Sequence, residues 1–508
     1  MKFILFAALA LAGWSSTATA QHQHEPMTAA GDGYGKVAMA NPGNAAAQAP
    51  FERGVALLHD FEYVAAAEAF RQAQAADPTF ALAYWGEAMT YNHPLWSEVD
   101  VDAARAALAK LGGDPAARRE KVRDAREGLW LDAVEALYGS GSKAERDAAY
   151  SERMRLLFDA NPNDIDARTF YALSIMGTAE DGRDIPTYMR AAALLEEAFP
   201  EHPDHPGLLH YLIHAYDDPA HAPLGQRAAG RYAVIAPAAG HAQHMISHIY
   251  LALGRWAEVE KANVTAMEVV NRLRASKGRP PAHCGHYDEW LVYAVLQQGG
   301  DASSLIAECR SDAAAELAKS IAAKTVIGPH RSDVSSWSDV AVRQVVDTGA
   351  APDFLSLPPN GYALARFNLA YAEMLLGRHS SAKVAQALAV MKKQRALIRA
   401  ALPKEAPDDH ELGPWIDRAV AQGEAVAALA AGQRARGLKL LDAAAAAEAA
   451  LPPPFGPPVL QKPSYELLGD ELLALGRKAD AAAAYRHALA AAPNRRLSVL
   501  GLKAATAP

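Results

Sequence analysis

The chain of 508 residues contains only two cysteines, Cys284 and Cys309. A disulfide scaffold needs several pairs, so that class is excluded, while a single bridge between the two cysteines remains open in an oxidising compartment. Beyond the N-terminus no stretch is apolar for long enough to cross a bilayer, which predicts a protein without a membrane span. Net charge is −8 with both signs interspersed, and this lack of basic excess argues against nucleic acid as a partner.

The common signatures of catalysis are also missing. The sequence has no Gly-rich phosphate loop, no Cys-x-x-Cys, no Gly-x-Ser-x-Gly elbow and no His-Glu-x-x-His zinc-protease motif. Few segments alternate between apolar and polar residues with a period of two, so little sheet is expected. Whether the chain is an enzyme stays open at this stage.

The first twenty residues have the pattern of a secretory signal peptide. Lys2 gives a positive flank, "FILFAALALAGW" is a short apolar run, and "ATA" at 18–20 is a small-residue cleavage site. The mature protein is therefore predicted to be soluble and exported, either periplasmic or secreted. Residues 21–49 are rich in Ala, Gly, Gln and His without an apolar period, and we expect them to form a flexible arm.

From Phe51 onward the pattern is helical, with Gly or Asp/Asn-Pro punctuation at intervals of one helix. Separations of 12, 4, 3 and 5 residues link a Gly, an Ala, an aromatic residue, an Ala and a Pro in two places: Gly54, Ala66, Phe70, Ala73 and Pro78, and again Gly469, Ala481, Tyr485, Ala488 and Pro493. This spacing resembles the tetratricopeptide repeat (TPR), in which small residues let two antiparallel helices cross closely. The resemblance implies an all-α protein, an α-solenoid of helix-turn-helix repeats in one or two arms, with a concave groove.

The resemblance covers most of residues 50–300 and 361–500 and is strongest at the two ends. It implies an N-terminal TPR-like array over 50–350, which holds a His-rich groove, and a C-terminal array over 351–508. Within the second array, "LPPPFGPPVLQKP" at 451–463 cannot be helical, so we expect it to run extended as a strap before the last repeat.

Two heptapeptides 34 residues apart, "HYLIHAY" at 210–216 and "HMISHIY" at 244–250, carry histidines in the same places. Within each heptapeptide the histidines are one helical turn apart and share a face. First helices of neighbouring TPR units stand side by side along the groove. The resemblance therefore implies that His210 and His214 lie beside His244 and His248, on helices whose axes are about 8–10 Å apart.

Other potential ligands accompany these pairs, and ten of the eighteen histidines lie between 202 and 286. Neutral imidazole is the commonest protein ligand for zinc, copper and iron, and paired histidines on rigid helices are a known way to build such sites. We predict that the groove binds a transition-metal ion (Zn, Cu or Fe). The predicted ligands and their neighbours are His210, His214, His244, His248, His241, Asp217, His286 and Glu289.

The segments around both heptapeptides, "HPDHPGLLHYLIHAYDDPAHAP" and "IAPAAGHAQHMISHIYLALGRW", also resemble a group of exported bacterial TPR proteins without an established activity. That resemblance implies the fold and export, and no catalytic residue. His205 is expected as a cap or loop residue, and His59 as a structural or solvated one. Side chains predicted to line the groove for a ligand are Trp85, Met89, His93, Tyr211 and Tyr250.

Three functions remain open from the sequence. The first is metal handling, or metal-assisted binding of a peptide, a protein or a small ligand in the groove. The second is a metalloenzyme, a hydrolase or an oxidase, that uses the same histidines with an open coordination position. The third is a metal-free scaffold whose histidines form a polar lining and whose groove takes a partner's helix or tail.

Overall fold

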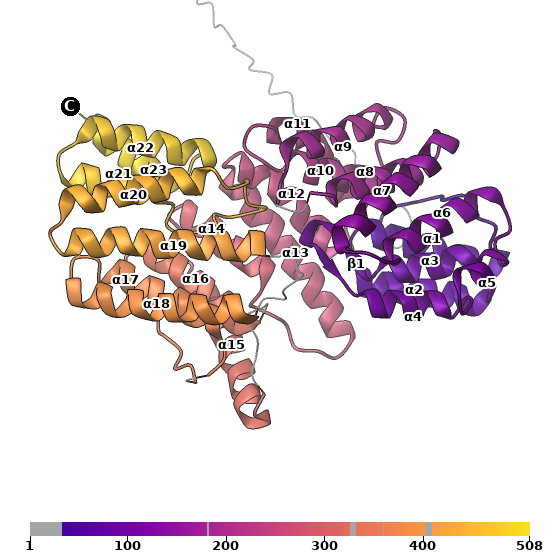
Figure 1. Cartoon of the computed structure of the whole chain (residues 1–508), viewed down its shortest axis with the longest axis horizontal. Coiled ribbons are helices and arrows are strands. Elements are labelled where there is room, and N and C mark those ends of the chain that lie inside the picture. The colour runs from indigo at the N-terminus through magenta and orange to yellow at the C-terminus, as the bar shows by residue number, and fades with distance from the viewer. Residues whose placement is uncertain (1–32, 180–181, 326–331, 359, 402–408, 508) are drawn as a thin grey trace, which may run out of the picture.

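The computed structural model describes residues 33–179, 182–325, 332–358, 360–401 and 409–507. The signal peptide expected over 1–20 lies outside these residues. The described chain forms 23 α-helices, one 3-10 helix (η1, Pro94–Trp96) and a two-stranded antiparallel ribbon of β1 (Asn92–His93) and β2 (Glu98–Val99) (Figure 1). The prediction of an all-α protein is confirmed. Among the described helices, none combines the length and the apolar character that crossing a bilayer requires.

The helices of the N-terminal half are α1 (Ala45–His59), α2 (Tyr63–Ala76), α3 (Ala81–Met89), α4 (Val101–Ala109), α5 (Pro115–Arg119), α6 (Ala125–Leu137), α7 (Lys143–Ala160), α8 (Ile165–Met176), α9 (Ile185–Ala198), α10 (Pro206–Tyr216), α11 (Ala222–Ile235), α12 (Gly240–Ala252) and α13 (Trp256–Ser276). Those of the C-terminal half are α14 (His286–Gln297), α15 (Ser303–Ala323), α16 (Asp333–Thr348), α17 (Ala363–Leu376), α18 (Ser381–Ala401), α19 (Asp409–Ala430), α20 (Arg434–Ala449), α21 (Ser464–Ala474), α22 (Lys478–Ala491) and α23 (Arg496–Thr506).

Successive helices pack as hairpins, and the hairpins stack along the chain. Pairs such as α1 with α2, α12 with α13 and α21 with α22 make the most extensive contacts, and the first helix of one pair also contacts the first helix of the next, as α10 does with α12. Because each hairpin buries its apolar side against its neighbours, the architecture is an α-solenoid of helical repeats.

The residues of the repeated spacing meet as the TPR resemblance implies. A Cβ atom on Gly54 would lie 2.8 Å from the ring of Phe70, and one on Gly469 would lie 2.7 Å from the ring of Tyr485. Each glycine on the first helix therefore makes room for the aromatic side chain of the second. Only a residue without a side chain lets the two helices approach this closely.

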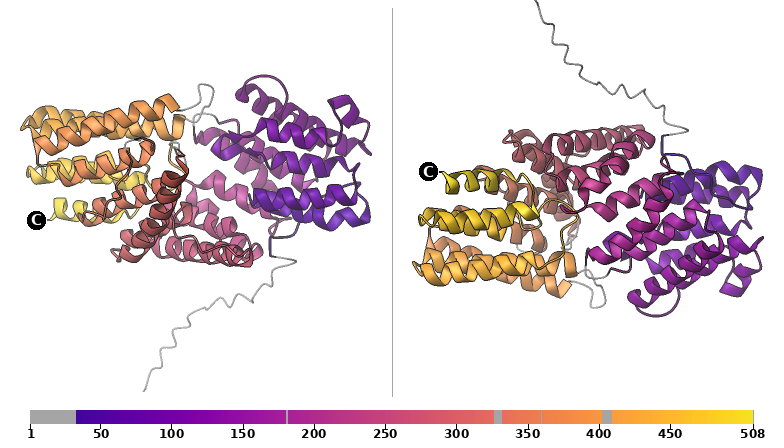
Figure 2. Two further views of the ribbon diagram at one scale, coloured as in Figure 1. Left: turned by 90° about the horizontal axis from the view of Figure 1, so that it is seen from below. Right: turned by 90° about the horizontal axis from the view of Figure 1, so that it is seen from above.

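Apolar residues gather in two large cores, one between Val37 and Ala252 and one between Val342 and Ala505, with a smaller cluster between Cys284 and Ala365. Figure 2 shows the two sets of helices side by side. A buried ion network holds the last repeat: Glu466 pairs with Arg495 at 2.8 Å and with Lys462 at 3.0 Å.

The first described residues are packed rather than free. Val37 and Met39 are buried in the N-terminal core, the backbone oxygen of Gly33 accepts a hydrogen bond from the amide of Ala238, and Asn44 caps α1. This packing corrects the expectation of a flexible arm for residues 33–49, because the two apolar side chains insert between helices although the segment has no apolar period. Residues 21–32 lie outside the described chain.

Two other sequence expectations concern the Pro-rich strap and the two cysteines. Residues 451–463, the strap, contain no helix and connect α20 to α21, in agreement with the prediction. Cys284 and Cys309 form a disulfide, which resolves the open question of their pairing. The bridge ties the segment just before α14 to α15, and α14 carries two of the residues predicted around the metal, His286 and Glu289.

Candidate metal centre

Helices α10 and α12 bring the two histidine pairs together in the interior. His210, His214, His244 and His248 are only 0%, 3%, 0% and 4% exposed. Two further histidines complete two groups of three, in each of which one ring nitrogen per histidine lies within 4.8 Å of the others. The first triad is His210, His214 and His241, and the second triad is His244, His248 and His286.

The ring nitrogens within each triad are in direct contact. Nε2 of His210 lies 3.1 Å from Nε2 of His214, and Nε2 of His244 lies 3.1 Å from Nε2 of both His248 and His286. The triads adjoin each other, since the ring centroids of His214 and His248 are 5.8 Å apart. Six imidazoles therefore surround one continuous region of the interior.

Hydrogen bonds behind the rings fix the tautomers. Nδ1 of His210 donates to the backbone oxygen of His59 (2.6 Å), and Nδ1 of His244 donates to Oδ1 of Asn263 (2.7 Å). The Asn263 amide is oriented by its own Nδ2, which donates to the backbone oxygen of Val259 at 2.8 Å, so Oδ1 must face the histidine. These acceptors require Nδ1 of each ring to carry its proton, which leaves a lone pair on Nε2.

The third such bond explains the position of Asp217. Its Oδ2 accepts from Nδ1 of His248 at 2.6 Å and from Nη2 of Arg183 at 3.2 Å. Asp217 therefore stands behind an imidazole and does not face the other ligands. Its position is that of a residue that orients a histidine and not that of a direct metal ligand.

Facing lone pairs make the second triad chemically unusual. Both His244 and His248 carry their proton on Nδ1, yet their Nε2 atoms are 3.1 Å apart. Two lone pairs at that distance repel unless a cation lies between them. Burial lowers the pKa of His244 well below its ordinary value, and its neighbours His286 and His248 lower it further, so His244 does not itself take up a proton at neutral pH.

Metal coordination fits this geometry. Two nitrogen ligands at 2.0–2.1 Å from a tetrahedral zinc ion are about 3.3 Å apart, close to the observed separations. In the first triad, Nδ1 of His214 and Nε2 of His241 are buried without a hydrogen-bond partner among the described residues. Burial also lowers the pKa of His210 to about 3, so this imidazole stays neutral and available as a ligand.

Glu289 lies apart from both triads. It lines the same cavity as the histidines but faces α16, where Ser336 and Asp339 are its neighbours. Burial, reinforced by the charge of Asp339, raises the pKa of Glu289 to about 8, so its carboxyl group is mostly protonated at neutral pH. A protonated acid is a poor ligand, and Glu289 therefore belongs to the cavity wall.

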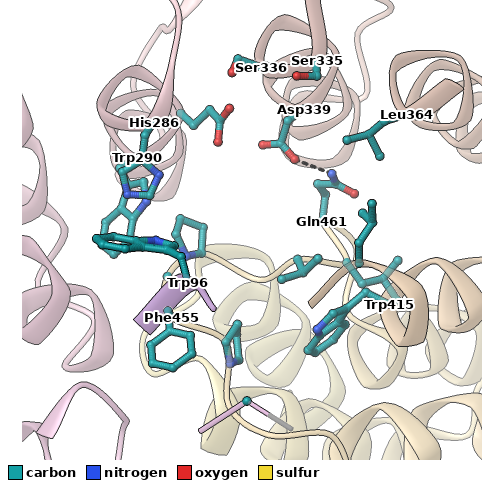
Figure 3. A pocket seen from close by; sticks show the side chains of 18 of the residues that line it. Trp96, His286, Trp290, Ser335, Ser336, Asp339, Leu364, Trp415, Phe455 and Gln461 are labelled. Carbon is teal, nitrogen blue, oxygen red and sulfur yellow. Dashed lines mark hydrogen bonds between the residues drawn. The ribbon is translucent and has the colours of Figure 1, made fainter. Parts of the chain in front are cut away.

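The cavity itself has a volume of about 430 Å³ and lies between the triads and the C-terminal array (Figure 3). Four imidazoles open onto it, those of His214, His241, His248 and His286. The opposite wall consists of α16, α17, α19 and the strap. Four of the six histidines are buried, His241 is half-buried and His286 is exposed, and the strap lies across the space that they face.

The five residues predicted to line a groove do not line this cavity. Trp85 is fully buried against Trp130, Met89 belongs to the same core, and Tyr211 is buried with its hydroxyl 2.9 Å from Nδ1 of His59. They are core residues because α3 and α10 are enclosed by neighbouring helices on every side.

The last two of the five lie outside the cavity for other reasons. His93 stacks on Tyr63 with ring centroids 4.0 Å apart, and Tyr250 lies under Arg255. Phe455 and Trp415 line the far wall and were not among the residues predicted from the sequence. An aromatic residue inside a Pro-rich, non-helical segment was the available signal for Phe455.

A third cluster, His59, Asp166 and His205, contrasts with the triads. Nε2 of His59 and of His205 contact Oδ1 of Asp166 at 3.1 Å and 3.2 Å, and Nδ1 of His205 accepts from the amide of Leu208 to cap α10. Every ring nitrogen therefore has a partner that is not another histidine. This network agrees with the structural role expected for His59 and the capping role expected for His205. It also borders the first triad, because the backbone oxygen of His59 accepts the hydrogen bond from Nδ1 of His210.

Comparisons with known proteins add little to this geometry. No protein-family model and no curated protein matches the chain. Among solved structures, the chain is similar to a crystal structure of the TPR domain of P58(IPK), with 10% identity, coverage of 91% of this chain and 97% of that one, and a TM-score of 0.21. A TM-score this low carries no argument, so the assignment depends on the helix pairs described above. The chain is a TPR-like α-solenoid.

Proposed function

We propose that this protein binds transition-metal ions in its interior, one in each histidine triad. The observation that carries the proposal is the pair of Nε2 lone pairs that face each other across 3.1 Å between His244 and His248. Burial makes a proton unfavourable there, and a metal ion removes the repulsion. The hydrogen bonds to Nδ1 are the outer partners that metal-binding histidines ordinarily have.

The ligand chemistry restricts the metal. Each triad offers three imidazoles and neither a thiolate nor a thioether, which suits zinc, copper or iron and does not suit magnesium or calcium. Three protein ligands leave a coordination position for water or for another molecule. Metal handling or metal-assisted ligand binding is therefore the first candidate role.

A catalytic role is the second candidate. It is favoured by the cavity of about 430 Å³ onto which ligands of both triads open, because a metal ion beside such a cavity can activate water or a bound molecule.

Export is part of the proposal as well. The leader-like first twenty residues and the Cys284–Cys309 disulfide both support an oxidising, extracytoplasmic compartment.

Elemental analysis of the untagged protein, purified from its native compartment and also reconstituted with Zn²⁺, tests the metal proposal. We expect about two equivalents in the parent protein, since each triad supplies the usual three ligands of an open site. Replacing His244 and His248 by Gln should leave about one equivalent, and so should replacing His210 and His214. His487→Gln is the matched control, because this histidine stacks on Tyr465 in the C-terminal array.

The outcome separates the open functions. A metal content below about a tenth of an equivalent in the native and reconstituted protein, with intact helical circular dichroism, would favour the metal-free scaffold. Loss of metal in the paired variants but not in His487→Gln would support the proposal. An activity screen on the metal-loaded protein then separates metal handling from catalysis.

A further inference from the structure

The cavity has a wall that metal binding does not use. Opposite the triads, the strap and helices α16, α17 and α19 line the space, and these segments come from the C-terminal half of the chain. Ligand pockets for small molecules commonly enclose about 300–1,000 Å³, and this cavity of about 430 Å³ falls in that range. A metal ion with its bound water would leave most of that volume to be filled.

Aromatic side chains dominate the remaining wall. Trp96, Trp290, Trp415 and Phe455 surround the space in Figure 3, and they come from four separate elements: η1, α14, α19 and the strap. Flat rings on several sides favour a flat apolar body between them. Phe455 is held in place by Arg183, whose guanidinium lies 4.3 Å from the ring centroid.

The polar groups of the wall are nearly balanced in charge. Asp339 accepts from Gln461 (2.5 Å) and from Nε of Arg343 (2.6 Å), and Arg183 pairs with Asp217. The cavity therefore has no large excess of either sign, which disfavours a polyanion or a polycation as its occupant.

Two guanidinium groups border the cavity but do not offer these donors to it. Nε of Arg183 and Nη1 of Arg343 lack a hydrogen-bond partner among the described residues, yet both atoms are fully covered although their side chains line the cavity. The polar end of an occupant therefore belongs at the histidines. A metal ion held by three histidines keeps a coordination position that an oxygen substituent can take.

We propose that the cavity binds a small aromatic molecule with oxygen substituents, its ring among the four aromatic side chains and its oxygens toward the triads. The proposal deepens the proposed function and rests on it for the metal end of the ligand. The aromatic wall is independent of whether a metal is bound.

The probe is 4-nitrocatechol, a flat aromatic diol whose absorbance band shifts when it coordinates a metal. It is titrated into the full-length protein in Zn²⁺-loaded and metal-free form, and binding is followed by absorbance and by tryptophan fluorescence. We expect saturation with a Kd below about 1 mM for the Zn²⁺-loaded parent protein. Phe455→Leu and Trp415→Leu should each raise that Kd by about tenfold with an unchanged metal content, because both side chains contact the ring and not the triads.

Phe158→Leu is the matched control, since Phe158 packs on Tyr171 outside the cavity and should leave the Kd unchanged. Failure to saturate in a protein that holds its metal would overturn the ligand class and leave the metal proposal standing. An equal Kd in the cavity variants and the control would overturn it too, because the probe would then bind elsewhere. Saturation of a metal-free protein that still responds to Phe455→Leu would support the ligand class while the metal proposal fails.

Discussion

Replacing Asn263 by Leu tests the tautomer assignment on which the metal proposal depends. Asn263 is fully buried, and its Oδ1 is the acceptor 2.7 Å from Nδ1 of His244. Leu has a similar volume and no acceptor. In the variant, His244 can either keep its proton on Nδ1, where it has no partner, or move the proton to Nε2, where it faces His248.

Moving the His244 proton to Nε2 removes the repulsion between the Nε2 atoms of His244 and His248 in the metal-free variant. The stability of the metal-free variant should therefore change little. Metal binding must then reverse the tautomer and leave a buried N–H without an acceptor, which costs about 1–3 kcal/mol. That cost corresponds to a loss of about 5- to 150-fold in affinity, and removal of the outer partner of a metal-bound histidine typically costs about 10- to 100-fold. We therefore expect Zn²⁺ affinity at the second triad to fall by about 10- to 100-fold in Asn263→Leu.

Competition with a chromophoric chelator measures the affinity, and thermal unfolding of the metal-free protein measures the stability. Gln243→Leu is the matched control on α12, because its amide bonds two backbone oxygens, of Ala233 and Ala236, and makes no bond to a histidine. The control should lower the melting temperature and leave the affinity unchanged, the reverse of the Asn263 pattern. An unchanged Zn²⁺ affinity in Asn263→Leu would refute the tautomer argument.

Three further outcomes follow from the same structure. Asp217→Asn leaves the buried guanidinium of Arg183 uncompensated, so urea unfolding should show a loss of about 3 kcal/mol together with weaker metal binding. Burial alone would raise the pKa of Glu466, but its two buried cationic partners outweigh burial and lower the pKa to about 2. A lowered acid pKa contributes stability above the unfolded value of 4.5 that is lost as the pH falls toward 2, so acid unfolding followed by circular dichroism should lose this slope in Glu466→Gln. Replacing Cys284 and Cys309 by Ser opens a loop with a sequence separation of 25 and should lower the unfolding free energy by about 3 kcal/mol, read from urea unfolding against the disulfide-bonded parent protein, whereas the reduced parent should match the variant.

The histidine pairs were predictable because their geometry is local. A spacing of four residues puts two side chains on one helical face, and a 34-residue repeat sets two such helices side by side. His241, three residues before His244, was placed by the same periodicity and does reach the other histidines, although it joins the pair on α10. Helical periodicity predicts which face of α12 His241 occupies. Which of the two adjacent triads it joins depends on how the helices pack.

The cavity wall was not predictable in this way. Trp85 and Phe455 are both aromatic residues near a helix end or a Pro-rich turn, and nothing local distinguishes the one in the core from the one beside the histidines. The strap reaches the triads only because the C-terminal array folds back, with Arg495 donating to the hydroxyl of Tyr293 at 3.2 Å, across 202 positions of the sequence. Contacts this distant follow from the curvature of the whole solenoid.

Different parts of the chain supply the metal ligands and the opposite wall of the cavity. All six imidazoles and the hydrogen bonds that orient three of them come from residues before α15, so the metal centre is complete within the first part of the chain. Closure of the space beside it requires α16, α17, α19 and the strap. A protein that only stored metal would gain nothing from that second wall, which carries the aromatic rings of Trp415 and Phe455. The division therefore favours a metal centre that acts on, or together with, a bound organic molecule.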